Sequence, residues 1–291
     1  MKLFGRRRRP LEPVVVPACR TCGDTAGEVL DRHPVTIVPD TVLASSTWPA
    51  ERRERILTAC PSCGLVTDLG HQAHDAAAVA VPLGRELVEH GTTLADGSVV
   101  VDVADADPAW RSPLLDPSID DVYWFSIGSL ARTLRRAGFG VRAIRTLPSG
   151  RLQAEAVDAA AATSAPFAVE ESPAEIVEAV RYHVGRRAQL LDDQRHHIER
   201  NRSGGGVVAV WGAVPTTVAF LDALDDDEGI VSAVLDPDPA LAGQRLAGSD
   251  LPIVTPDDDA VAPSLVLVPD ASQRDIVGEC LGRVGSRSAV V

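Results

Sequence analysis

Short apolar runs and amphipathic stretches alternate along the chain, and each predicts an element. Compact apolar runs predict strands, whereas apolar residues spaced three or four apart predict helices. The predicted strands are 35–38, 98–103, 139–147, 207–211, 230–235, 265–268 and 289–291, and the predicted helices are 74–94, 127–137, 173–200, 215–224 and 272–283. Pro34 and Pro39 bound the first strand, Ser126 is the expected N-cap of the second helix, and an Ala-rich connection covers 155–169.

The clearest single element is the long helix that opens at Pro173. Ser172 and Glu175 are spaced as a capping box, with Pro173 at the first helical position. Its apolar residues lie near one stripe: Ile176, Val180, Val184, Leu191 and Ile198. The glycine-rich run that follows Ser203 ends the helix and predicts a domain boundary.

Strands and helices alternate after this boundary, which predicts a small parallel α/β sheet of Rossmann type. Gly212 follows the first of these strands, and Asp236 ends the next, 24 positions later. The pattern is typical of a nucleotide or phosphate held at a helix N-terminus, with Asp236 on a ribose and the hydroxyls of Thr216 and Thr217 nearby. A packed turn without a ligand is the alternative, because Pro215 removes a phosphate-facing N–H.

The charge of the chain restricts its partners. Lys and Arg total 28 against 41 Asp and Glu, a net charge of −13. Phosphate surfaces need a concentrated basic face, so this charge argues against nucleic-acid and anionic-membrane partners. The run Arg6–Arg9 has no apolar segment after it, so it predicts a disordered basic tail over 1–13 rather than a signal peptide. We therefore expect a cytoplasmic protein.

Four of the five cysteines fall in two Cys-x-x-Cys-Gly motifs. They are Cys19-Arg-Thr-Cys22-Gly and Cys60-Pro-Ser-Cys63-Gly, separated by the 37 residues from 23 to 59. Two such turns can place four thiolates tetrahedrally around Zn²⁺, and four protein ligands leave no open position, so the zinc is expected to be structural. A redox dithiol is the alternative. Cys280, on a predicted helix, is expected to be a small buried apolar residue.

Three landmarks together carry a family resemblance. The first is the pair of cysteine motifs, and the second is Tyr123-Trp-Phe-Ser-Ile-Gly followed by a helix ending in Ala-Gly-Phe139. The third is Val207-Val-Ala-Val-Trp-Gly-Ala213 with Val234-Leu-Asp-Pro-Asp-Pro239 and Leu251-Pro-Ile-Val254. In these features the chain resembles the zinc-containing, S-adenosylmethionine (SAM)-dependent C-methyltransferases that act on nucleotide-linked deoxysugars. The resemblance implies an N-terminal zinc module, the end of a methyltransferase core and a C-terminal Rossmann-like domain.

Two parts of the family pattern are missing. The SAM-binding half, a strand, a glycine-rich turn and a helix, has no place in the roughly 30 residues before Ser98, which is about one βαβ unit. The family's Tyr-His-Glu-His run is replaced by Ser118-Ile119-Asp120-Asp121. Asp120, Asp121 and Tyr123 are thus the catalytic candidates that remain, and a solvated acidic loop is the alternative for the two aspartates.

These inferences predict an α/β chain divided into a zinc-binding module (14–70), a truncated remnant of a methyltransferase core (71–170), a long linking helix (171–204) and a Rossmann-like domain (205–291). We expect a degenerate relative, a pseudoenzyme with structural zinc and without SAM. It would bind a nucleotide-sugar-like ligand or assist a partner enzyme in sugar or secondary-metabolite biosynthesis. An enzyme with altered chemistry and a methyltransferase completed by a partner chain are the alternatives.

Overall fold

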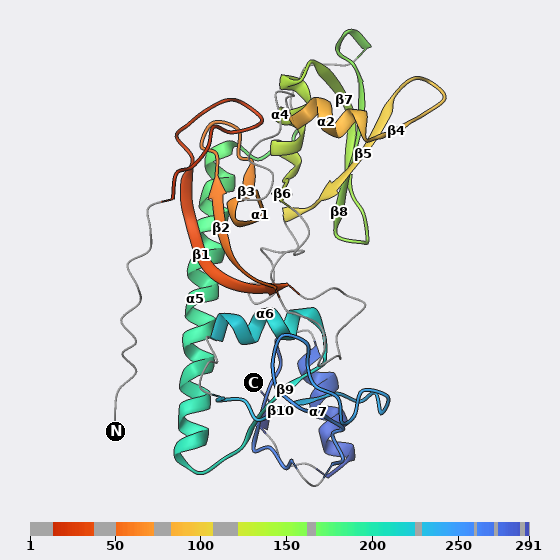
Figure 1. Cartoon of the computed structure of the whole chain (residues 1–291). Helices are drawn as coiled ribbons and strands as arrows, with labels where there is room; N and C mark the ends of the chain where they lie inside the picture. The colour runs from red at the N-terminus through yellow and green to blue at the C-terminus, as the bar shows by residue number, and fades with distance from the viewer. Residues whose placement is uncertain are drawn as a thin grey trace.

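The computed structural model describes residues 14–37, 51–72, 83–106, 122–161, 167–224, 229–258, 261–270, 273–285 and 289–290. The described residues form a mixed α/β structure with three sheets (Figure 1). The expected basic tail over 1–13 lies outside them. Within them, no helix combines the length and the hydropathy that crossing a membrane requires.

The first sheet is antiparallel, in the order β1-β2-β3-β6. Its strands are β1 (Glu28–Ile37), β2 (Glu51–Ala59), β3 (Val66–Asp68) and β6 (Tyr123–Trp124), and a short helix, α1 (Leu69–Gln72), follows β3. The prediction that Pro34 bounds a short strand is wrong, because β1 runs through Pro34. A proline is tolerated there because, within the described part of the chain, β1 is an edge strand that pairs with β2 alone.

The second sheet is also antiparallel, in the order β4-β5-β8-β7. It consists of β4 (Thr92–Thr93), β5 (Val99–Ala104), β8 (Arg151–Asp158) and β7 (Phe139–Thr146), with the 3₁₀ turn η1 (Ala159–Ala161) after β8. Helices α2 (Leu83–Glu89) and α4 (Ile127–Arg136) pack against it. Ser126 caps α4 through a capping box, which confirms the expected N-cap.

Two predictions in this region are wrong. Residues 155–158 belong to β8 rather than to an Ala-rich connection, because Ala154 and Ala156 point inward where α4 packs closely. The helix predicted over 74–94 covers only 83–89 of the described residues. Thr92 and Thr93 instead pair with Val100 and Val99 of β5, because the helix ends by Gly91 and the chain reverses direction between Leu94 and Gly97.

Helix α5 (Pro173–Ser203) runs past both the first and the third sheet and packs against each of them (Figure 1). Its capping box is as predicted: the Ser172 hydroxyl accepts from Glu175 N–H, and the Glu175 carboxylate accepts from Ser172 N–H. At 31 residues it is about 46 Å long. Its first half packs on β2, β3 and β6, and its second half packs on α6 (Pro215–Leu224) and the third sheet.

The third sheet is parallel, in the order β11-β10-β9-β12-β13. Its strands are β9 (Val208–Trp211), β10 (Ala233–Leu235), β11 (Ile253–Val254), β12 (Leu265–Leu267) and β13 (Ala289–Val290). Counted along the chain, this is the order 3-2-1-4-5 found in doubly wound folds. Alternate residues of β9 face opposite sides: Val208 and Val210 meet α5 and α6, whereas Ala209 and Trp211 meet α7 (Arg274–Arg283). The predicted parallel sheet is confirmed.

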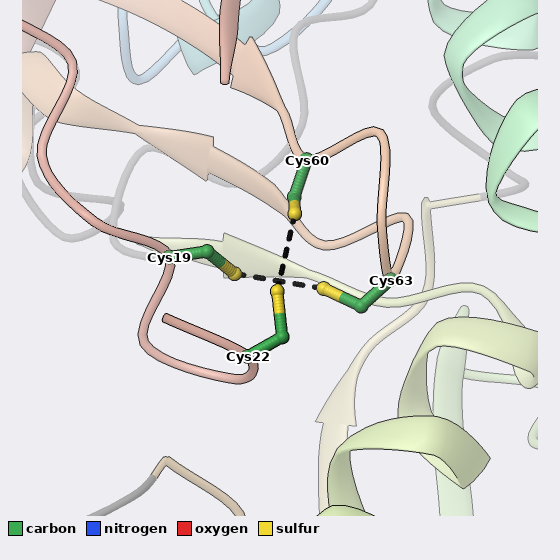
Figure 2. A group of neighbouring side chains, drawn as sticks. All are labelled: Cys19, Cys22, Cys60 and Cys63. Atoms are coloured by element: carbon green, nitrogen blue, oxygen red, sulfur yellow. Dashed lines mark hydrogen bonds between the residues drawn. The ribbon is translucent and has the colours of Figure 1, made fainter. Parts of the chain in front are cut away.

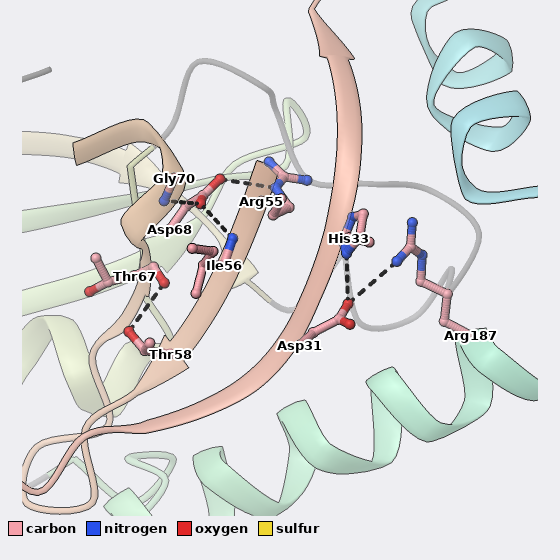
Figure 3. Close-up of polar contacts among 9 residues, drawn as sticks. All are labelled: Asp31, His33, Arg55, Ile56, Thr58, Thr67, Asp68, Gly70 and Arg187. Carbon is pink, nitrogen blue, oxygen red and sulfur yellow. Dashed lines mark hydrogen bonds and ion pairs between the residues drawn. The ribbon is translucent and has the colours of Figure 1, made fainter. Parts of the chain in front are cut away.

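The side of the first sheet that faces α5 carries charged groups beside its apolar residues (Figure 3). Asp31 of β1 lies 3.0 Å from His33 Nδ1 and 3.4 Å from Arg187 of α5. On β2, Arg55 is only 1% exposed. Its Nε donates to Asp68 at 3.1 Å, and its guanidinium stacks on Trp124, 5.0 Å from the ring centroid. We call Asp31, His33, Arg55, Asp68 and Arg187 the polar layer.

The Arg55–Asp68 pair holds the end of β3 against β2. The Asp68 carboxylate also accepts from the N–H groups of Ile56 and Gly70, so the ion pair and the backbone share one carboxylate. We predict that Asp68→Ala lowers the free energy of unfolding by about 3–5 kcal/mol, because it removes one partner of a buried ion pair and two hydrogen bonds to the backbone of β2 and α1. Urea unfolding measures this. As a matched control, Asp102→Ala removes an exposed partner of Arg151 and should cost less than about 1 kcal/mol. Equal losses would contradict the assigned role.

The Asp31 carboxylate should make stability depend on pH. Burial raises the pKa of Asp31, but the hydrogen bond and charge of His33 and the charge of Arg187 outweigh burial, so the pKa lies below its ordinary value of 3.8. Its stabilising contribution is therefore present above that value and is lost as the pH falls through the folded-state pKa. The difference in unfolding free energy between the native chain and Asp31→Asn should shrink from about pH 5 toward pH 2. A difference that grows on acidification would contradict the direction.

Candidate metal centre

Two loops with the same backbone hydrogen-bond pattern form the candidate site. In residues 19–24, Gly23 N–H donates to the Cys19 carbonyl and Cys19 N–H donates to the Asp24 carbonyl, at 2.7 and 2.8 Å. In residues 60–65, Gly64 and Cys60 repeat the two bonds at 2.8 and 3.0 Å. We call these loops the first and the second knuckle. Both glycines have positive φ, 74° and 75°, which explains the glycine after each motif.

The four thiol groups converge on one point between the knuckles (Figure 2). All four Sγ atoms lie within 4.8 Å of one another. Cys19 and Cys63 are 3.5 Å apart, as are Cys22 and Cys60, and all four are free thiols. Tetrahedral zinc with Zn–S bonds of about 2.3 Å places its sulfurs about 3.8 Å apart. The donor set and its spacing thus fit a metal ion such as zinc.

The thiols perturb one another strongly. Hydrogen bonds from Cys60 and Cys63 lower the pKa of Cys19 to about 4. The hydrogen bond that Cys63 gives to Cys19 raises the pKa of Cys63 far above its ordinary value. Four thiolates at this spacing repel one another, so all four ionise together only when a cation offsets their charge.

Side chains of the first knuckle attach it to β6, α2 and α4. Arg20 donates to the Tyr123 hydroxyl at 3.0 Å and to Glu86 of α2 at 2.6 Å, and it stacks on the Tyr123 ring. The Thr21 and Thr133 hydroxyls are 3.0 Å apart. Thr133 already donates to the Ser129 carbonyl, so it accepts from Thr21. The first knuckle is thereby held against α2 and α4.

The second knuckle is part of the hydrophobic core. Cys60 and Cys63 are buried beside Leu130 and Leu134 of α4. Arg132 donates from Nε to the Cys63 carbonyl at 2.9 Å. A hydrogen bond from Ser62 to Asp24 joins the two knuckles directly. The candidate site is therefore built into the same core as the second sheet.

The catalytic candidates separate into two groups. Asp120 and Asp121 lie outside the described residues. Tyr123 lies on β6, and its hydroxyl accepts from Arg20, which gives it a supporting contact beside the first knuckle. Its role as an acid or base stays a prediction.

The ligand-binding candidates meet at the carboxyl end of β9 and β10. Gly212 has φ of +87° and its N–H donates to the Leu235 carbonyl at 2.8 Å. Asp236 is buried and accepts from Ala213 N–H at 2.8 Å and from Asp238 N–H at 2.9 Å. The Thr217 hydroxyl donates to the Gly212 carbonyl at 2.6 Å, whereas Thr216 is half-buried in the first turn of α6. Gly212, Thr217 and Asp236 thus hold the strand ends together, and ligand binding stays a prediction.

Sequence reasoning missed the residues that fix the knuckles in place: Arg20, Thr21, Glu86, Arg132 and Thr133. Arg20 and Thr21 occupy the two variable positions of the first motif, and polar residues there were the available signal. Their partners are 66 to 112 positions away along the chain, so no local pattern identifies them.

No protein-family model matches the chain, and no curated protein matches it. Fold and site together define a mixed α/β protein with a parallel five-stranded sheet and four cysteines placed to hold a metal ion.

The metal content of cysteine variants tests the site. We predict that Cys63→Ser loses bound metal on dialysis, because the remaining three thiols leave the tetrahedral shell incomplete. Cys280→Ser is the matched control: Cys280 lies on α7 in another hydrophobic cluster, and its variant should retain about one metal equivalent. Elemental analysis by mass spectrometry gives both values. Equal metal content in the two variants would exclude Cys63 as a ligand.

Proposed function

We propose that the four cysteines hold one structural zinc ion. The observation that carries this proposal is the convergence of four free thiols within 4.8 Å. Zinc suits a shell of four thiolates, and a shell filled by protein ligands leaves no position for a substrate or for water. The burial of Cys60 and Cys63 in the core agrees with a stabilising role.

The zinc would stabilise a segment that has no regular secondary structure of its own. Described residues 14–27 contain no helix or strand, and β1 begins only at Glu28. In contrast, Cys60 directly follows β2, and Gly64 lies so close to α5 that a Cβ there would be 2.5 Å from Ile176. A zinc ion would therefore fasten an irregular segment to a rigid part of the core.

We also propose that the chain is a relative of the sugar C-methyltransferases that does not bind SAM. The two cysteine motifs and the C-terminal parallel sheet resemble the corresponding parts of that family, which supports the proposed relationship. Between the second knuckle and β5, the described residues form β3, α1, α2 and β4, and β4 pairs antiparallel with β5. A SAM-binding half needs a strand, a glycine-rich turn and a helix in sequence, and this arrangement supports its loss.

A SAM-binding assay tests the loss. Isothermal calorimetry of the zinc-loaded chain with SAM should show no heat of binding at SAM concentrations up to about 1 mM. The free energy of SAM binding is then less favourable than about −4 kcal/mol. Binding in the micromolar range would contradict the proposal. The retained zinc, measured on the same sample, shows that the protein is intact.

The remaining role is recognition, and we propose a nucleotide-sugar-like ligand at the carboxyl end of the parallel sheet, in support of a partner enzyme. Doubly wound sheets bind ligands at this edge. Asp236 accepts hydrogen bonds here, and each carboxylate oxygen can accept a further one from a ligand hydroxyl. Thr216 adds a half-buried hydroxyl at the start of α6.

The Thr216 hydroxyl offers a test that leaves the Asp236 contacts intact. Thr216→Val should weaken binding of UDP-glucose, used as the probe, about 2- to 10-fold, as expected for one hydrogen bond. Thr146→Val on β7 is the control and should leave the affinity unchanged. Calorimetry measures both. Absence of UDP-glucose binding by the native chain, or equal affinity in both variants, would contradict the ligand site.

A further inference from the structure

We propose that the four-cysteine site is a peroxide-responsive switch, in which oxidation expels the metal and joins the knuckles by Cys19–Cys63 and Cys22–Cys60 disulfides. The inference rests on the proposed zinc site and assigns it a regulated, redox-dependent state. It concerns only the four cysteines and the contacts between them.

The pairing follows from the geometry of the sulfurs. The two contacts of 3.5 Å both run from one knuckle to the other, Cys19 to Cys63 and Cys22 to Cys60 (Figure 2). A disulfide bond is about 2.0 Å long, so each pair has to close by about 1.5 Å. Side-chain rotation and small shifts of the first knuckle can supply this, because its segment lies outside regular secondary structure.

Access to oxidant is unequal across the site. Cys19 and Cys22 of the first knuckle are half-buried, whereas Cys60 and Cys63 are buried. A small hydroperoxide therefore reaches a sulfur of the first knuckle before one of the second. The sulfenic acid formed there has a second-knuckle sulfur 3.5 Å away as its partner.

The proposed reaction balances with hydrogen peroxide as the oxidant. One thiolate attacks the peroxide, its O–O bond breaks, and the sulfenic acid and water result. The facing thiolate then attacks the sulfenic sulfur, the S–S bond forms, and the hydroxyl leaves as water after protonation. Two such cycles oxidise four thiolates by four electrons, consume two peroxides and four protons, and release four waters and one Zn²⁺.

The structure after oxidation follows from which residues are joined. Metal and disulfides both connect the first knuckle to the second, so the disulfides replace the zinc as the link. Arg20, which attaches the first knuckle to α2, and Arg132 of α4, which binds the second knuckle, keep their partners. The oxidised, zinc-free protein should therefore keep its fold, unlike the reduced protein stripped of zinc by a chelator.

The experiment uses the full chain carrying Cys280→Ala, which leaves only the four site cysteines. Zinc content is measured first, so that a chain without metal counts against the proposed zinc site and not against the switch. Hydrogen peroxide is then titrated in. We expect release of one zinc per two peroxides, loss of all four thiols, retention of the near-ultraviolet circular dichroism signal, and recovery of zinc binding after a thiol reductant.

Peptide mapping identifies the disulfides. Trypsin cuts after Arg20, between Cys19 and Cys22. Disulfides between the knuckles therefore join three tryptic peptides, whereas disulfides within the knuckles leave the Cys60–Cys63 peptide separate. Fragmentation between Cys60 and Cys63 assigns each bond. In Cys19→Ser, Cys22 should pair with Cys60 and leave Cys63 free. Pairing within a knuckle, any other pairing, oxidation to sulfinic acid without disulfides, or unfolding on zinc release would overturn the proposal.

Discussion

The convergence of four thiol groups on one point is the constraint on which the N-terminal half of the structure depends. Residues 14–27 form no helix or strand, so contacts made at a distance must fix their position. The thiols supply the central contact, and Arg20 and Thr21 add contacts to α2, β6 and α4. Closing the chain between Cys22 and Cys60 costs conformational entropy, which the proposed metal–thiolate cross-link would offset. The same link would hold β1 beside β2, whose register starts at Glu28 opposite Ala59, next to Cys60.

Helix α5 extends this organisation to the rest of the chain. One buried stripe runs along its length: Ile176, Val180, His183, Arg187, Leu191, Gln194 and Ile198. The apolar ends of the stripe enter two separate hydrophobic clusters, one with the first sheet and one with the parallel sheet. Between them Arg187 meets Asp31 (Figure 3). Apolar contacts thus bury both ends of the helix, and the Arg187–Asp31 ion pair connects the middle of the helix to β1.

Sequence reasoning succeeded where the determinants are local. Both cysteine motifs, the N-cap at Ser126, the capping box at Ser172, and the alternation of strands and helices after Gly206 depend on residues within a few positions of one another. It failed where tertiary context decides. β8 contains inward-facing alanines that resemble a connection, and β1 continues through Pro34 because it is an edge strand. The predicted stripe of α5 is confirmed at Ile176, Val180, Leu191 and Ile198, which are buried, and Val184 packs partly buried beside the cluster of the first sheet. The prediction missed the buried His183 and Arg187, because the partner of Arg187 is Asp31, which lies far away in sequence on β1. The supports of the metal site were missed for the same reason, since their partners are distant in sequence.

X-ray absorption at the zinc edge on the purified, reduced chain is the most direct measurement. A structural site made by both knuckles predicts one zinc per chain with a shell of four sulfurs at about 2.3 Å and no nitrogen or oxygen ligand. A shell with fewer sulfurs would mean that one cysteine is not a ligand and that the site has an open position. A reduced chain that keeps its native circular dichroism without any metal would contradict the proposed dependence of the N-terminal half on the metal.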